Sequence, residues 1–205
     1  VEIANGDGST SQVIDAANYT RTPNGSQSFT LTIDNVKTCA AAAGLNLNDG
    51  ATITVTYTAH LNDNAFVNTA GGSTDNKNSV FLQYSNNPRI STSLDKTTTS
   101  EVCVYTYQLN NTKHQNTENG PVLQGAGFRL YSDKACTQEV KLYQKDNFYF
   151  PIKDATDKDK DAVQMISGQD GQFNVKGLDA GTYYLKETKT PDDYSPCPDT
   201  EIVIS

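Results

Sequence analysis

The sequence Gly177-Leu-Asp-Ala-Gly-Thr-Tyr-Tyr-Leu-Lys-Glu-Thr188 decides the fold of the second half of this chain. After a turn signal at 179–181, Tyr183, Leu185 and Glu187 occupy alternate positions. Alternate residues of a strand point to the same face of a sheet, so we expect these three side chains on one inward face. A carboxylate among Tyr and Leu is costly unless it is neutral or paired. Glu187 is therefore a candidate functional residue, the alternative being an edge strand with Glu187 in water.

Short strand patterns recur along the whole chain. Thr, Tyr and Val favour strands, and the abundant Asn, Asp and Gly favour the turns between them. The segments that alternate or are rich in strand formers are 28–33, 51–59, 79–84, 102–109, 126–131, 148–152, 172–175, 182–186 and 201–204. Residues 40–44 are Ala-rich and predict one helical turn that Gly44 ends. The pattern predicts an all-β fold of the β-sandwich type.

Charge and hydropathy exclude several classes of protein. The formal net charge of the 205 residues is −8, and the basic residues are dispersed, so we expect no nucleic-acid surface. No apolar run approaches the roughly 20 residues that span a bilayer. No signal peptide precedes the mature-looking start at Val1, so we expect targeting and anchoring signals outside this stretch.

Cys39, Cys103, Cys136 and Cys197 lie far apart, and no two of them form a C-x-x-C pair. Zinc sites favour close ligand pairs, so this spacing predicts no metal site. An even number of isolated cysteines in a β-rich chain is typical of disulfides in an oxidising compartment, and three pairings are open. Free buried thiols in a cytosolic protein are the alternative.

Three parts of the sequence resemble pilins. Asn78-Ser-Val-Phe-Leu-Gln-Tyr-Ser-Asn-Asn-Pro88, preceded by Thr54–Ala65, resembles the end of the fimbrial D2 domain of Gram-positive sortase-assembled pilins. Val104–Lys113 followed by Leu123–Tyr131 resembles the opening of a Cna protein B-type (SpaA-like) domain. Gly177–Tyr194 is similar to the pilin E-box, Tyr-x-Leu-x-Glu-Thr-x-Ala-Pro-x-Gly-Tyr. The order of the three parts makes the resemblance specific.

The resemblance implies two tandem Ig-like sandwiches, both incomplete at the chain ends. Residues 1–88 would be a D2-like domain without its N-terminal part, 89–100 a linker, and 101–205 a B-type domain without its last strand. It further implies a structural subunit of a pilus or wall-anchored stalk, located outside a Gram-positive cell and joined to other pilin subunits by sortase. Such a subunit needs no cofactor and is not an enzyme, apart from one intramolecular cross-link.

That cross-link would be a Lys–Asn isopeptide bond. The resemblance implies that Lys113 is the amine and Glu187 the catalytic acid of the second domain, and that Asn78 is the amide partner of the first. An attacking lysine must be neutral, and burial lowers its pKa, whereas the same burial would keep Glu187 protonated. The sequence departs from the E-box at Thr190 and Asp193, and no Asn follows Tyr194. The partners of Lys113 and Asn78 are therefore expected outside this chain.

Two further residue pairs follow from the domain boundaries. Cys136 and Cys197 both belong to the second domain and are the favoured disulfide pair. Cys39 and Cys103 would then link the two domains or both stay free. Closing a long loop in this way adds about 2–4 kcal/mol to stability. Asp199 is a carboxyl group that an amine could attack, but it lies in a predicted turn.

The residues also bear on three other functions. An adhesin module would bind a host glycan or matrix protein through loops such as 62–77 or 153–170. A hydrolase would need paired carboxylates or a catalytic triad, and the sequence shows neither spacing. Asp157-x-Asp159-x-Asp161 has the spacing of a calcium loop, but Ala162 stands where that loop requires Gly, so a solvated turn is favoured.

Overall fold

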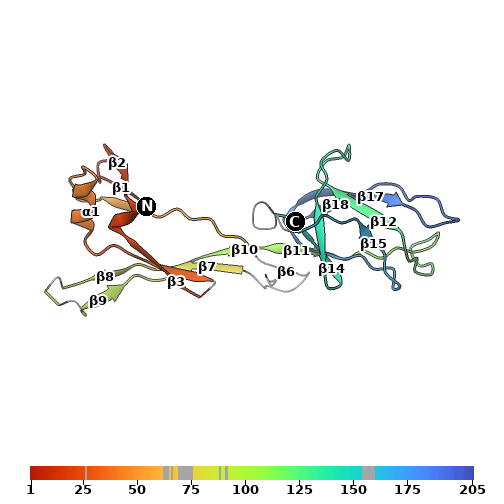
Figure 1. Ribbon diagram of the computed structural model, residues 1–205, viewed down its shortest axis with the longest axis horizontal. Helices are drawn as coiled ribbons and strands as arrows, with labels where there is room; N and C mark the ends of the chain where they lie inside the picture. The colour runs from red at the N-terminus through yellow and green to blue at the C-terminus, as the bar shows by residue number, and fades with distance from the viewer. Residues whose placement is uncertain are drawn as a thin grey trace. The chain divides into compact units, whose positions relative to one another are not determined.

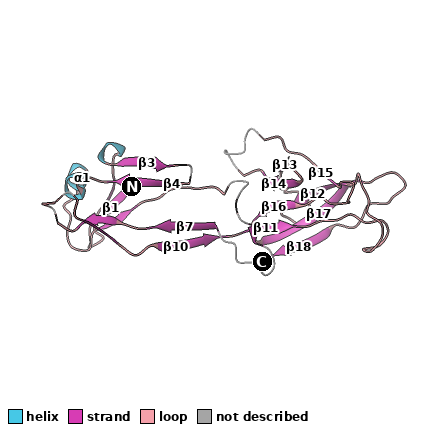
Figure 2. Cartoon of the chain, turned by 90° about the horizontal axis from the view of Figure 1, so that it is seen from below, coloured by secondary structure: helices cyan, strands magenta, loops and turns pink. Residues whose placement is uncertain are grey.

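The computed structural model describes residues 1–25, 27–61, 65, 67–68, 76–87, 89–90, 92–153 and 160–205. These residues form two compact units, Val1–His60 and Leu61–Ser205. Strands dominate both units, which confirms the all-β prediction (Figures 1 and 2). No helix in the described part of the chain has the length and apolar character needed to cross a membrane.

The first unit contains a three-stranded sheet, a hairpin and two short helices. The sheet has the order β2 (Ser11–Val13), β1 (Glu2–Ala4), β5 (Thr52–Thr54), and all its pairs are antiparallel. The hairpin joins β3 (Thr20–Asn24) to β4 (Ser28–Thr32), and η1 is Ala16–Asn18. A small core gathers around the sheet and helix α1, and its buried members are Ile3, Ile14, Cys39, Ala40 and Leu45.

Helix α1 (Val36–Ala42) begins earlier than the Ala-rich segment 40–44 predicts. The side chain of Asn35 accepts a hydrogen bond from the Thr38 N–H and so caps the first turn. The chain leaves the helix at Gly44, where φ is +77°, as the sequence predicts.

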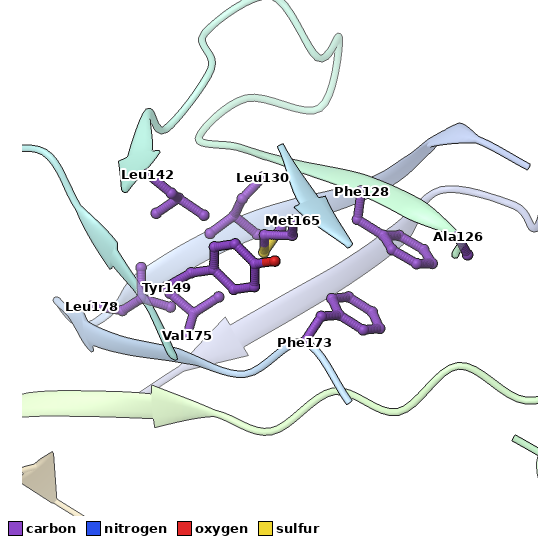
Figure 3. Close-up of a cluster of buried hydrophobic side chains, with 9 residues drawn as sticks. All are labelled: Ala126, Phe128, Leu130, Leu142, Tyr149, Met165, Phe173, Val175 and Leu178. Atoms are coloured by element: carbon purple, nitrogen blue, oxygen red, sulfur yellow. The ribbon is translucent and has the colours of Figure 1, made fainter. Parts of the chain in front are cut away.

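The second unit contains two larger sheets. One has the order β13 (Leu142–Lys145), β14 (Phe148–Pro151), β16 (Val175–Leu178), β11 (Thr106–Leu109), β6 (Val67–Asn68). The other has the order β15 (Met165–Ile166), β12 (Gly127–Tyr131), β17 (Gly181–Lys189), β18 (Thr200–Ile204). Buried side chains from both sheets meet in one core, so the sheets form a sandwich: Ala126, Phe128, Leu130, Leu142, Tyr149, Met165, Phe173, Val175 and Leu178 (Figure 3).

Strand β17 lies between β12 and β18 and is antiparallel to both. Tyr183 and Leu185 pack against the core of the sandwich, and Glu187 is buried on the same strand. The predicted inward face of this strand is therefore confirmed. The strand itself is longer than the predicted segment 182–186, because β18 pairs with its residues 181–185 and β12 with residues between 184 and 189.

Two two-stranded ribbons involve the segment expected to be a linker. Strand β9 (Leu94–Lys96) pairs with β8 (Gln83–Ser85), and β10 (Ser100–Val104) pairs with β7 (Asn76–Val80). The segment 89–100, expected to be a linker, thus contains strand residues at 94–96 and 100. Cross-strand partners rather than an apolar pattern define these strands, since most of their side chains are exposed. The domain boundaries at 88 and 101 stay a prediction.

Candidate functional site

Lys113 lies just beyond the end of β11, where its main chain is hydrogen-bonded on both sides. Its N–H donates to the Gly171 carbonyl at 2.8 Å, and its carbonyl accepts from the Leu123 N–H at 2.8 Å. Gly171 has φ +73°, and a Cβ at this position would lie 2.8 Å from the Lys113 carbonyl oxygen. The neighbouring turn therefore requires glycine, and it fixes the Cα from which the lysine side chain extends.

Glu187 faces Lys113 from β17, where it pairs with Phe128 of β12 beside a register shift at Gly127. The Glu187 side chain is fully buried, and that of Lys113 is 14% exposed. Lys113 Nζ lies 3.0 Å from Glu187 Oε2. The structure thus brings together the two residues that the sequence pattern selects, although they are 74 positions apart in the chain.

The two oxygens of Glu187 have different surroundings. Oε2 also accepts a hydrogen bond from the Cys197 main-chain N–H, at 2.9 Å. Oε1 is buried and has no hydrogen-bond partner among the described residues. A buried carboxylate oxygen without a partner is unusual in a folded protein, so this atom is the one open to a further group.

The charge state of Glu187 differs from the expectation of a protonated acid. Burial raises the pKa of Glu187, but the hydrogen bonds from Cys197 and Lys113 outweigh it, and the pKa lies below its usual range. The prediction that burial alone keeps Glu187 protonated is wrong for this arrangement, because its partners stabilise the charged form. Lys113 and Glu187 form a buried ion pair.

A groove of about 1120 Å³ is lined by Lys113 of this pair. Its apolar lining includes Leu123, Phe128, Phe173 and Leu185, and Lys113 and Cys197 also face it. Lys113 Nζ lies 6.0 Å from the centroid of the Phe128 ring, within the range of a cation–π contact. The volume exceeds that of a single side chain, so the groove can hold an extended segment.

Sequence reasoning selected Cys197 only as a disulfide partner and missed its place beside Glu187. Phe173, which lines the groove, was not selected either. Cys197 follows Glu187 by ten residues, so the chain must turn back after β17 to place its N–H against the carboxylate. No local pattern signals that return, although the Pro residues at 191, 196 and 198 predict irregular backbone there.

The other predicted site residues lie elsewhere. Asn78 is exposed on β7, opposite Val102 of β10, a setting unlike the buried one of Lys113 and Glu187. Asp199 is exposed, and one of its carboxylate oxygens lies 3.8 Å from the Cys136 sulfur. The role of Asn78 stays a prediction.

The expected disulfides are not formed in this structure. Cys39, Cys136 and Cys197 carry free thiols. The first is buried in the core of the first unit, the second contacts Asp199, and the third lies against the core of the sandwich beside Glu187. The pairings Cys136–Cys197 and Cys39–Cys103 stay predictions.

Several segments proposed for binding lie outside the described residues. These are most of the loop at 62–77, residues 154–159 of the loop at 153–170, and with them two of the three acidic residues of the weighed calcium loop. In the part of the chain that the structure describes, no group of three or more acidic, His or Cys side chains is placed to hold a metal ion.

Comparison with known proteins agrees with the fold. Residues 108–205 match the family model of the SpaA prealbumin-like fold domain. No curated protein matches the chain. The crystal structure of the group B streptococcus pilus 2b backbone protein is 25% identical, with a TM-score of 0.60 over 98% of this chain and 68% of that one. A C-terminal fragment of the major pilin GBS80 of Streptococcus agalactiae shares the fold, with 22% identity and a TM-score of 0.63 over 100% of this chain and 73% of that one.

The second unit is thus a prealbumin-like sandwich with a buried Lys–Glu pair. Residues 108–205 match a SpaA prealbumin-like fold domain, and the chain as a whole is similar in fold to backbone pilins of Gram-positive bacteria.

Proposed function

We propose that this chain is a structural subunit of a surface pilus or wall-anchored stalk, in which Lys113 and Glu187 promote one intramolecular isopeptide bond. The buried ion pair, whose lysine lines an open groove, carries this proposal. An ion pair in such a position is rarely kept for stability alone, because an apolar pair of similar volume serves stability as well or better. The likeness to a pilus backbone protein supports the structural role.

The chemistry depends on water leaving the groove. While the groove is open, water and hydrogen bonds stabilise both charges. When a segment fills it, a neutral amine and a neutral acid are less costly than two desolvated ions. One proton then passes from Lys113 Nζ to Glu187, which leaves an amine that can attack a carbonyl carbon.

The acyl group would be a carboxamide in the occupying segment. Nζ forms a new C–N bond to its carbon while the protonated Glu187 donates a hydrogen bond to the carbonyl oxygen, for which Oε1 is available. The original amide C–N bond breaks as Glu187 gives its proton to the departing nitrogen, and the carboxylate then takes up the surplus proton of Nζ, which leaves Glu187 protonated. Ammonia is released, and each domain reacts only once.

The remaining parts of the proposal follow from the class of protein. Subunits of this kind would be joined by sortase on the outside of a Gram-positive cell, and Asn78 would serve a separate cross-link of the first domain. A disulfide between Cys136 and Cys197 would close the long segment between them and restrain the same sandwich. No cofactor takes part.

Intact mass of the full-length native protein tests the cross-link. Each isopeptide bond lowers the mass by about 17 Da through loss of ammonia, and each disulfide by about 2 Da. We expect Lys113→Met and Glu187→Gln to abolish the loss of about 17 Da assigned to the second domain by peptide mapping. Lys134→Met, which changes an exposed lysine of the same domain, should retain it. A native mass without any loss of ammonia would refute the proposal.

A further inference from the structure

The segment between β17 and β18 returns past Glu187 without continuing the sheet. The last pair of the two strands is Leu185 with Thr200, and the pairing is antiparallel. Continued beyond this pair, the same register would place Pro198 opposite Glu187. A proline has no N–H with which to extend the ladder, so the pairing stops at Thr200 and the segment before it contacts β17 in another way.

Within residues 196–198 the one main-chain donor is the N–H of Cys197. Pro196 and Pro198 flank it, and neither has an N–H. Each proline fixes its own φ and restricts the residue before it to extended conformations, so the backbone around Cys197 has little freedom. Its N–H donates to Glu187 Oε2 at 2.9 Å. Ordering this donor costs little conformational entropy, because the prolines restrict the unfolded chain as well.

We infer that Pro196-Cys197-Pro198 is a positioning element for the Lys113–Glu187 pair: its single N–H fixes the carboxylate in the orientation that presents Oε2 to Lys113. Lys113 Nζ and the Cys197 N–H bond the same oxygen, at 3.0 and 2.9 Å. Two donors on one oxygen restrict rotation of the carboxylate about its last side-chain torsion, which is otherwise broad. The thiol is not needed for this role, since any residue except proline at position 197 would supply the N–H.

Burial makes this hydrogen bond important for Glu187. The Glu187 side chain is fully buried, so bulk water does not replace a lost donor. Burial raises the pKa of Glu187, and the Cys197 N–H is the first of the hydrogen bonds that lower it, followed by those of the Cys197 thiol and the Lys113 ammonium. Under the proposed function, on which this consequence rests, the segment keeps the acceptor of the lysine proton 3.0 Å from Nζ.

The test is an NMR titration of the 205-residue chain with its thiols reduced. The side-chain carboxyl carbon of Glu187 gives the pKa, and the Cys197 amide proton should shift with the same midpoint. Cys197→Pro removes the N–H and the thiol, whereas Cys197→Ala removes the thiol alone. We expect a higher pKa of Glu187 in Cys197→Pro than in Cys197→Ala, because only the proline variant loses a donor to the charged form. Equal pKa values in the two variants would overturn the inference.

Further measurements keep the test decisive if Cys197→Pro does not fold. In the parent, a Cys197 amide proton that does not follow the titration of Glu187 would by itself overturn the inference. The shift of this proton should disappear in Glu187→Gln and persist in Glu139→Gln, which neutralises a carboxylate paired elsewhere on the same sandwich. Replacing Pro196 and Pro198 together by Ala should speed hydrogen exchange of the Cys197 amide. Unchanged exchange in that variant would show that the prolines do not fix the donor.

The cross-link of the full-length native protein gives a separate readout. If the proposed bond forms, Cys197→Pro should slow it about tenfold or more relative to Cys197→Ala, because the carboxylate is no longer held beside Nζ. Equal rates for the two variants would contradict the positioning role. A native mass that shows no loss of ammonia would refute the proposed function, whereas the titration would still decide whether the segment fixes Glu187.

Discussion

The rings of Phe128 and Phe173 are stacked, with centroids 4.2 Å apart and an interplanar angle of 6°. Phe128 belongs to β12, and Phe173 precedes β16 of the opposite sheet, so this contact joins the two layers of the sandwich (Figure 3). Both rings line the groove, and Phe128 also lies under the Lys113 ammonium. The lysine of the buried ion pair therefore lies over a ring that also joins the two sheets.

Phe173→Ala should lower the free energy of unfolding of the second unit by about 3–5 kcal/mol, because it leaves a cavity in the core. Urea unfolding followed by circular dichroism measures the change. Phe81→Ala is a suitable control, since that ring is 54% exposed, and we expect it to cost less than about 1 kcal/mol. Equal losses for the two variants would show that Phe173 does not support the core.

Glu187→Gln should destabilise the second unit by about 3 kcal/mol, because it leaves the Lys113 charge desolvated and without its counter-ion. The matched variant Glu139→Gln breaks an ion pair whose side chains are 39% and 29% exposed, so its cost should stay below about 1 kcal/mol. Chemical denaturation of both variants under one condition gives the comparison. A Glu187→Gln protein as stable as the parent would contradict the buried ion pair.

The Glu187 ion pair should also make stability depend on pH. The folded pKa of Glu187 lies below the value of an unfolded glutamate, so the unfolded state binds the proton more readily. The contribution is fully present above the unfolded pKa and is lost as the pH falls through the folded pKa. Unfolding free energies measured from neutral to acidic pH should therefore fall more steeply for the parent than for Glu187→Gln. If acidification instead stabilised the parent relative to Glu187→Gln, the pKa of Glu187 would be raised on folding and not lowered.

Gly6→Ala should destabilise the first unit by at least about 1–3 kcal/mol. A Cβ at this position would lie 1.8 Å from the Asp49 carbonyl oxygen, so the turn after β1 would have to move away from the segment before β5. Amide hydrogen exchange should show lost protection in β1 and β5. Gly8→Ala is the control: it meets no atom within 4 Å, and its φ of +68° limits the expected cost to about 1 kcal/mol. Similar exchange in the two variants would argue against this close packing.

The central strands and the Lys–Glu pair could be predicted from the sequence because a local pattern encodes them. The alternation of Tyr183, Leu185 and Glu187 places one side of β17 inward, and the resemblance to pilins selects Lys113 as its partner. Their contact could only be confirmed in three dimensions, since Glu187 lies on β17 and Lys113 in the segment after β11, 74 positions apart in the chain.

Other features depend on contacts that no local pattern records. Strand β9 and the start of β10 were assigned to a linker, because most of their residues are exposed and the ribbon pairing alone defines them. The charge state of Glu187 was predicted in the wrong direction, because burial was visible in the pattern and the Cys197 N–H was not. Helix α1 was placed too late, since its Asn35 cap lies before the Ala-rich segment.

The two main-chain hydrogen bonds of Lys113 have a mechanical consequence. With its N–H held by Gly171 and its carbonyl by Leu123, the residue acts as a fixed pivot, and only the four-carbon arm can swing. The positions that Nζ can reach are therefore restricted to the length of the side chain. Any reactive group must come within that distance of the Lys113 Cα. The rate of bond formation would then be set by how fast the segment that carries the reactive group docks, because the main chain of Lys113 is already held in place.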